Sequence, residues 1–170
     1  MPQDFDVFRA ALVALLPRLR AFARFLARDP AVADDLVQDT LLRALRAGGP
    51  RDPATDLRLW TFAILRNRFR DQRRRAAVEL GALAGMPRDE GHAGNQEAHA
   101  ALTDLEAALS RLPAVQREAL TLVAALGFTV EEAAVVVGVP TGTIKARIAR
   151  ARLRLARTPV RRSEPREACE

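Results

Sequence analysis

The sequence of 170 residues contains one cysteine, one lysine, one tryptophan and no tyrosine. The single cysteine, Cys169, excludes an internal disulfide framework. No apolar run approaches the roughly 20 residues that a transmembrane helix needs. Asp4 and Asp6 precede any apolar run, which argues against a signal peptide. We therefore expect a cytoplasmic protein that does not enter a membrane.

Residues that could carry catalysis or hold a metal are also scarce. The two histidines, His92 and His99, lie in a glycine-rich stretch without a second pair of ligands, which argues against a zinc site. The sequence has no glycine-rich phosphate-binding loop, and no grouping of His, Cys or carboxylate residues indicates a nucleophile with its base. We therefore expect no enzymatic activity, no metal and no other cofactor.

Positive charge, by contrast, is abundant. The formal net charge is +6 and the isoelectric point is about 11.1, which favours a polyanionic partner. All but one of the 27 basic residues are arginines. Their clustering is more informative than their number, because some segments carry many arginines and others carry none.

The run 129–157, TVEEAAVVVGVPTGTIKARIARARLRLAR, predicts two short helices around a tight turn. Thr129 and Glu132 have the spacing of a capping box at the start of the first helix. Gly138 suits the left-handed backbone at its end, and Pro140 prevents it from continuing. This is a helix-turn-helix pattern, which points to double-stranded DNA.

The second of these helices has an apolar stripe and a basic outer side. We expect Thr141 or Thr143 to cap it. The inner stripe consists of Ile144, Ile148, Ala151 and Leu155. The residues opposite or flanking the stripe are Ala146, Ala149, Arg150, Lys145, Arg147, Arg152 and Arg154. Small outward residues let a helix enter the major groove, where the cations meet phosphates or guanine edges. The alternative is a solvated basic helix of a bundle, but the agreement of caps, turn and charge argues against it. The outward position of Leu153 suggests a protein contact.

The rest of the chain indicates an all-α protein of two small helical domains. Expected helices in the first domain are Phe5–Leu16, Arg18–Arg28, Ala31–Ala47 and Asp56–Arg75, separated by Pro17, Pro30 and the Gly48–Gly49–Pro50 cluster. No segment alternates at period two, so no sheet is expected. The glycine-rich stretch 80–100 suits a flexible linker. We therefore predict domains at 1–79 and 101–160, the latter beginning with leucines at helical spacing, and a frayed tail at 161–170.

Two polar surfaces of the first domain have opposite charge. Four residues share one side of its third helix: Asp34, Asp35, Gln38 and Asp39. A solvated face is the simpler interpretation of charge alone. The fourth helix interleaves aromatic residues with arginines, a combination that suits unstacked bases and a phosphate backbone. A core stripe of Trp60, Ala63, Ile64 and Asn67 with an exposed basic end is an equal alternative.

Taken together, these motifs resemble a known family. The runs 33–44, ADDLVQDTLLRA, and 57–67, LRLWTFAILRN, look like region 2 of bacterial sigma factors of the sigma-70 type. The run 112–120, LPAVQREAL, and the helix-turn-helix look like region 4. A chain with only these two regions resembles the extracytoplasmic-function group. Details such as 64–67, ILRN, and 128–134, FTVEEAA, are most similar to its alphaproteobacterial general-stress-response branch.

The resemblance implies a role for each surface. The acidic face would dock on the β′ clamp of core RNA polymerase, and region 4 would meet the β flap. The residues implied at the −10 element are Asp56, Trp60, Asn67, Arg70, Arg73 and Arg74. Those implied at the −35 element are Thr141, Thr143, Lys145, Ala146, Arg147, Ala149 and Arg150. The chain departs from the family's usual sequence at Ala149 and Asp56 and in having no tyrosine. These departures affect which promoter sequence we expect it to recognise, not its role as a sigma factor.

Kinship also implies a small anti-sigma factor as a further partner. Two other functions compete with this interpretation. A sigma-like decoy would sequester that antagonist without binding DNA, but it would have no reason to keep two basic faces. An ordinary helix-turn-helix repressor would leave the acidic helix and the Trp60 helix without a purpose. The expected function is therefore promoter recognition for core polymerase.

Overall fold

The computed structural model describes residues 2–79 and 108–157, and every regular element within these ranges is helical, as predicted. The first module contains α1 (Pro2–Ala27), α2 (Pro30–Ala47) and α3 (Leu57–Glu79). The second contains α5 (Ala114–Leu120), the π-helical segment η1 (Thr121–Ala125), α6 (Val130–Val137) and α7 (Thr141–Ala156). The predicted linker at 80–100 and tail at 161–170 lie outside the described residues.

Helix α1 runs through Pro17, so the prediction of two helices broken at that residue is wrong. A proline removes one backbone donor, the N–H that would bond to the carbonyl four residues earlier. Pro17 and Val13 are both exposed, so the carbonyl left without a partner can bind water. The opposite side of the helix buries Leu12, Leu19 and Phe22 on both sides of the proline. Packing of this continuous apolar side outweighs one missing hydrogen bond.

The other two helices of the first module begin and end close to where the sequence predicts. The Asp29 side chain accepts a hydrogen bond from the Val32 N–H at 3.0 Å and caps α2, which begins at Pro30. Gly48 ends α2 in the left-handed conformation, with φ of 69°. Asp56 accepts from the N–H groups of Arg58 at 2.7 Å and Leu59 at 3.2 Å, so it caps α3.

The helix-turn-helix forms as predicted, apart from the cap of its second helix. Thr129 and Glu132 form the capping box of α6, and Gly138 ends it with φ of 67°. The prediction that Thr141 or Thr143 caps α7 is wrong, because α7 already begins at Thr141 and no side chain caps it. Proline at position 140 sets its own φ, here −58°, and directs the chain into the helix.

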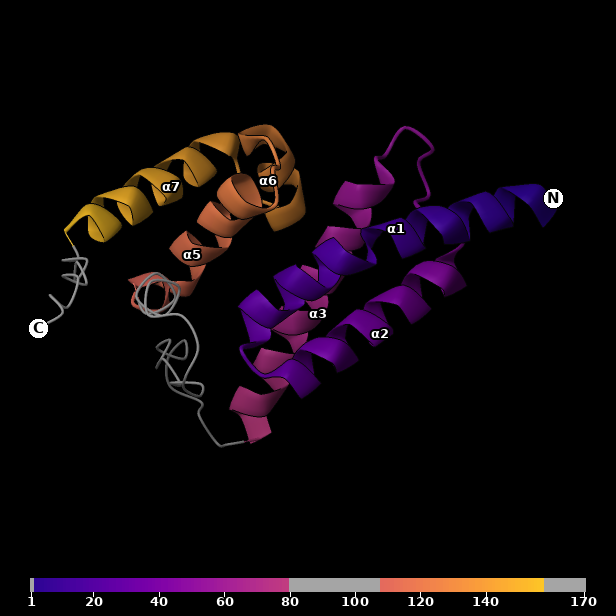
Figure 1. Cartoon of the computed structure of the whole chain (residues 1–170), viewed down its shortest axis with the longest axis horizontal. Helices are drawn as coiled ribbons and strands as arrows, with labels where there is room; N and C mark the ends of the chain where they lie inside the picture. Colours follow the sequence, from indigo (N-terminus) through magenta and orange to yellow (C-terminus); the bar gives the residue numbers. More distant parts are fainter. Residues whose placement is uncertain (1, 80–107, 158–170) are drawn as a thin grey trace, which may run out of the picture.

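The two modules pack against each other through one continuous core. Figure 1 shows α6 beside the first half of α3, and contacts between these two helices join the modules. The Phe62 ring of α3 lies between Phe22 of α1, with ring centroids 5.5 Å apart, and Phe128 of the second module, at 4.9 Å. Leu122 and Leu126 belong to the same buried cluster. Sequence patterns had not indicated this contact between the modules.

Candidate polymerase and promoter interfaces

Helix α7 presents a basic face built on a buried apolar stripe. Ile144, Ile148 and Ala151 are buried, so the residues between them are turned outward. The exposed residues of the outer side are Lys145, Ala149, Arg150, Arg152, Leu153 and Arg154. Thr141, Thr143 and Ala146 are half-buried at the beginning of the helix. A straight helix with small and basic outward residues and no acid fits the major groove of duplex DNA.

Arg147 differs from the other cations of α7. It is half-buried, and its Nη1 atom is covered without a hydrogen-bond partner among the described residues. In this arrangement that atom does not face solvent, whereas Lys145 and Arg150 are exposed. The two exposed cations are therefore the stronger members of the predicted −35 set.

Helix α3 carries four of the predicted −10 residues on one side. Asn67, Arg70 and Arg74 are exposed at spacings of three and four residues. Trp60 shares this side, seven residues before Asn67, and is half-buried. Arg73 lies further round the helix, with its guanidinium 5.8 Å from the centre of the Phe69 ring. This side combines an aromatic surface with positive charge, which suits a strand with unstacked bases.

The buried side of α3 is not the stripe that the alternative interpretation expected. The buried residues are Thr61, Phe62, Leu65 and Arg66, whereas Trp60, Ala63 and Ile64 are only half-buried. Helix α3 contacts α1 and α2 on one side and α6 on another, so its buried arc is wider and rotated. The −10 side lies outside this arc. The predicted Asp56 is exposed at the start of α3, where its carboxylate caps the helix.

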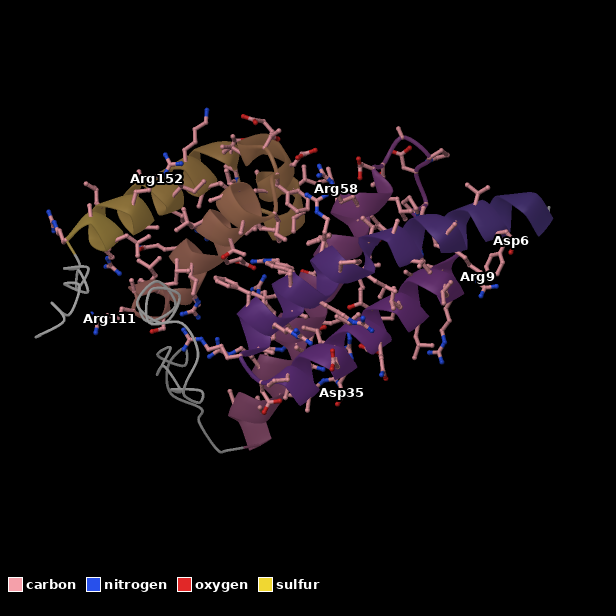
Figure 2. All side chains as sticks on the ribbon, in the orientation of Figure 1. Asp6, Arg9, Asp35, Arg58, Arg111 and Arg152 are labelled. Atoms are coloured by element: carbon pink, nitrogen blue, oxygen red, sulfur yellow. The ribbon has the colours of Figure 1, made fainter. Side chains whose placement is uncertain are left out.

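The acidic surface of α2 is divided between exposed and paired residues. Asp34, Asp35 and Gln38 are exposed, and Figure 2 shows Asp35 at the edge of the molecule far from Arg152 of α7. Asp39 instead accepts a hydrogen bond from Arg68 of α3 and lies 3.4 Å from Arg43. Burial alone would raise the pKa of the Asp39 carboxyl, but the hydrogen bond and charge of Arg68, with Arg43, lower that pKa overall. Asp39 therefore also joins α2 to α3.

Several arginines of the first module contact the second module, a use that sequence reasoning missed. Arg66 Nε lies 2.7 Å from Glu118 Oε1, and the two side chains are only 8% and 10% exposed. Arg58 lies 2.5 Å from Glu132 and stacks 4.4 Å from the Phe128 ring centre. Arg18 and Arg28 donate to backbone carbonyls of Leu126 and Ser110. The partners lie 52 to 108 residues away along the chain, so no local pattern could reveal them.

Within the described residues, no cluster of His, Cys, Asp and Glu could hold a metal ion. None of the described helices is long and apolar enough to cross a membrane.

Comparison with known proteins assigns the two modules. Residues 12–78 match the model for Sigma-70 region 2, and residues 102–155 match that for Sigma-70, region 4. The ECF RNA polymerase sigma factor EcfG of Rhodopseudomonas palustris is 44% identical over 155 residues, covering 89% of this chain and 84% of that protein.

Two solved structures are similar over most of the chain. The sigma factor RpoE of Bartonella quintana, in complex with the anti-sigma factor NepR, is 39% identical with a TM-score of 0.72, over 87% of this chain and 93% of that one. CnrH, in complex with the cytosolic domain of CnrY, is 29% identical with a TM-score of 0.63, over 91% of each chain.

Proposed function

The chain belongs to the sigma-70 family, in its extracytoplasmic-function group, and we propose that each of its polar surfaces makes a different contact of a sigma factor. As a sigma factor it binds core RNA polymerase and directs it to promoters. The proposal concerns which residues make each contact, and it has three parts.

The first part concerns the polymerase. We propose that the acidic face of α2 docks on the β′ clamp through Asp34, Asp35 and Gln38, while region 4 meets the β flap. These three residues are exposed on a protein of net charge +6, and neither aspartate forms an ion pair with another of the described residues. Asp39 contributes by holding α2 against α3 through Arg68.

The second part concerns the promoter. The exposed side of α3, with Trp60, Asn67, Arg70 and Arg74, meets the −10 strand as it separates. Holding a flipped base costs a few kcal/mol of unstacking and unpairing energy, which aromatic and arginine contacts help to offset. Helix α7 meets the −35 element, with Lys145 and Arg150 at its outer side. The observation that carries this proposal is the separation of two exposed basic faces on two different modules.

The third part concerns control. The similar RpoE structure holds the anti-sigma factor NepR, and the similar CnrH structure holds the cytosolic domain of CnrY. In sequence, the chain is similar to the sigma factor EcfG. We propose that this chain also serves a stress response and is held inactive by an anti-sigma factor. We place this function in the cytoplasm, where polymerase and chromosome meet. It needs no catalytic activity of the chain itself.

Run-off transcription with purified bacterial core polymerase tests the proposal. The wild-type chain should support initiation from a promoter of its group. Asp35→Arg should reduce holoenzyme formation at least about tenfold, because like charges placed in an interface cost several kcal/mol. Asp6→Arg is the matched control, since Asp6 is exposed on α1 outside the matched region, and it should leave transcription unchanged.

Two outcomes would count against the proposal. Equal losses for the two substitutions would indicate a general charge effect rather than a docking face. A chain that forms holoenzyme but changes initiation on no template would favour the sigma-like decoy instead.

A further inference from the structure

The first turns of α1 extend the apolar stripe of that helix beyond the segment that matches Sigma-70 region 2, which begins at residue 12. Leu12, Leu19 and Phe22 are buried on this stripe, and Phe8 lies on the same side of the helix, four residues before Leu12. Phe8 is half-buried, whereas Phe5, three residues earlier, is exposed. Phe8 is therefore the first aromatic residue of α1 that is packed within the fold.

The ring of Phe8 packs against the start of the loop that joins α2 to α3. A Cβ atom added at Gly49 would lie 3.7 Å from the Phe8 Cε2 atom, so the ring lies close to the loop backbone. Gly49 has φ of 120°, a conformation that residues with a side chain rarely adopt. Figure 1 shows this loop leaving the end of α2 and passing α1 before it reaches the start of α3. Phe8 therefore contacts the loop where it crosses α1.

The middle of the loop is shaped by hydrogen bonds within the loop itself. Residues 51–54 are all exposed. The Asp52 carboxylate accepts a hydrogen bond from the Ala54 N–H at 3.0 Å, and the Asp52 carbonyl accepts one from the Thr55 N–H at 3.0 Å. Bonds of this kind form a turn, but they do not attach the turn to the rest of the protein. The contact with Phe8 supplies such an attachment at the start of the loop.

The end of the same loop carries the first of the predicted −10 residues. Asp56 caps α3, and its backbone carbonyl accepts the N–H of Trp60, a second predicted −10 residue, at 3.0 Å. A loop that is held at its start samples fewer conformations, so less ordering is needed when a partner binds at its end. The Phe8 contact therefore lowers the entropic cost of binding a strand beside the start of α3.

We propose that Phe8 is a positioning residue for the −10 contact. Its ring holds the loop 48–56 against α1, so that the loop is already ordered beside Asp56 and Trp60 when the separated strand binds. Phe8 acts through the loop and not by touching DNA. The positioning role rests on the proposed function, whereas the support of the loop by Phe8 is a property of the free chain.

The first test measures the mobility of the loop in the free, full-length chain. A nitroxide spin label is attached to Ala54→Cys in a Cys169→Ser background, because Cys169 is the only cysteine of the sequence and Ala54 is exposed. Phe8→Ala removes the supporting ring and should give the narrower spectral lines of a more mobile label. Phe5→Ala is the matched control, since it removes the same kind of ring from an exposed position of the same helix, and it should leave the spectrum unchanged.

The second test measures strand binding by the holoenzyme assembled with core polymerase. Fluorescence anisotropy with a single-stranded −10 oligonucleotide gives the affinity. Phe8→Ala should weaken this affinity about 3–10-fold, because the loop must then be ordered on binding. Holoenzyme formation and binding to a −35 duplex should be unchanged, since those surfaces lie on α2 and α7. Phe8→Leu keeps an apolar contact and should restore most of the affinity, and Phe5→Ala should match the wild type.

Each outcome has a defined meaning. Unchanged label mobility in Phe8→Ala overturns the support of the loop. Greater mobility with unchanged oligonucleotide affinity overturns the positioning role, and so does an equal loss of affinity for the −35 duplex. Should circular dichroism show that Phe8→Ala has lost helix, Phe8→Gln provides the same comparison, because it keeps a long side chain without the ring. A wild-type chain that forms no holoenzyme, while Phe8→Ala still loosens the loop, contradicts the proposed function and the positioning role but not the contact.

Discussion

Helices α3 and α7 are both rich in arginine, with seven arginines in α3 and four in α7, but they place them differently. On α3, Arg58, Arg66 and Arg68 pair with acids contributed by α6, α5 and α2. On α7, Arg150 and Arg152 are exposed, and neither forms an ion pair with an acid among the described residues. The number of arginines on a helix therefore does not show which of them are exposed; the position of the acids in the fold does.

The largest expected effect is on stability and comes from removing the apolar side chain that lies between the α3 arginines. Phe62→Ala should lower the free energy of unfolding by about 3–5 kcal/mol, because it empties a fully buried site between two other rings. Urea denaturation followed by circular dichroism measures the loss. Arg70→Ala, on the other side of α3, should change stability by less than about 0.5 kcal/mol. Similar losses for both would mean that α3 is not divided into a packing side and a free side.

A second test addresses the exposed cations of α7. Arg150→Ala should weaken binding to a −35 duplex by about 1–3 kcal/mol if the residue contacts a base edge, with unchanged stability. Fluorescence anisotropy at several salt concentrations measures both the affinity and its salt dependence. Arg111→Ala removes another exposed arginine, outside α7, and should leave this affinity nearly unchanged. An equal effect of the two substitutions would reduce the role of α7 to nonspecific charge.

The smallest expected effect on stability concerns Asp39 of α2, whose carboxylate pairs with an α3 arginine. The pKa of Asp39 is lowered in the folded chain, so its contribution to stability is present above the unfolded pKa of about 4 and is lost as pH falls through the folded pKa. Asp39→Asn should therefore cost about 0.2–1 kcal/mol at neutral pH and nothing in strong acid. Denaturation curves between neutral pH and about pH 2 measure the difference. A cost that persists unchanged in acid would exclude the ion pair as its cause.

Local sequence signals predicted the helices and their ends well where the cause was local. The capping box of Thr129 and Glu132 and the left-handed glycine at 138 depend on residues only a few positions apart. The apolar stripe of α7 was also confirmed, with Ile144, Ile148 and Ala151 buried. The outward position of Leu153, 60% exposed, followed from the same periodicity. Each of these features is determined within one or two helical turns.

Predictions failed where a distant contact outweighed a local preference. Pro17 does not end α1, because the buried side of the helix continues past it. Thr141 is an exception with a local cause: it does not cap α7, because the neighbouring Pro140 already directs the backbone into the helix. The buried stripe of α3 is rotated from Trp60 towards Phe62, because α6 packs against it. Whether the predicted polymerase and promoter residues make those contacts remains a prediction for the experiments above.

The all-α class, the helix-turn-helix, and the family that the ordered motifs resemble all follow from the order of residues along the chain. These features depend on periodicity, caps and the order of motifs along the chain, which can be recognised from residues that are close together in the sequence. Which arginines face solvent and which are paired between modules depends instead on how the helices pack. Glu118 and Arg66 are 52 residues apart in the sequence, and Glu132 and Arg58 are 74 residues apart. Such pairs form only once folding has brought the two residues together.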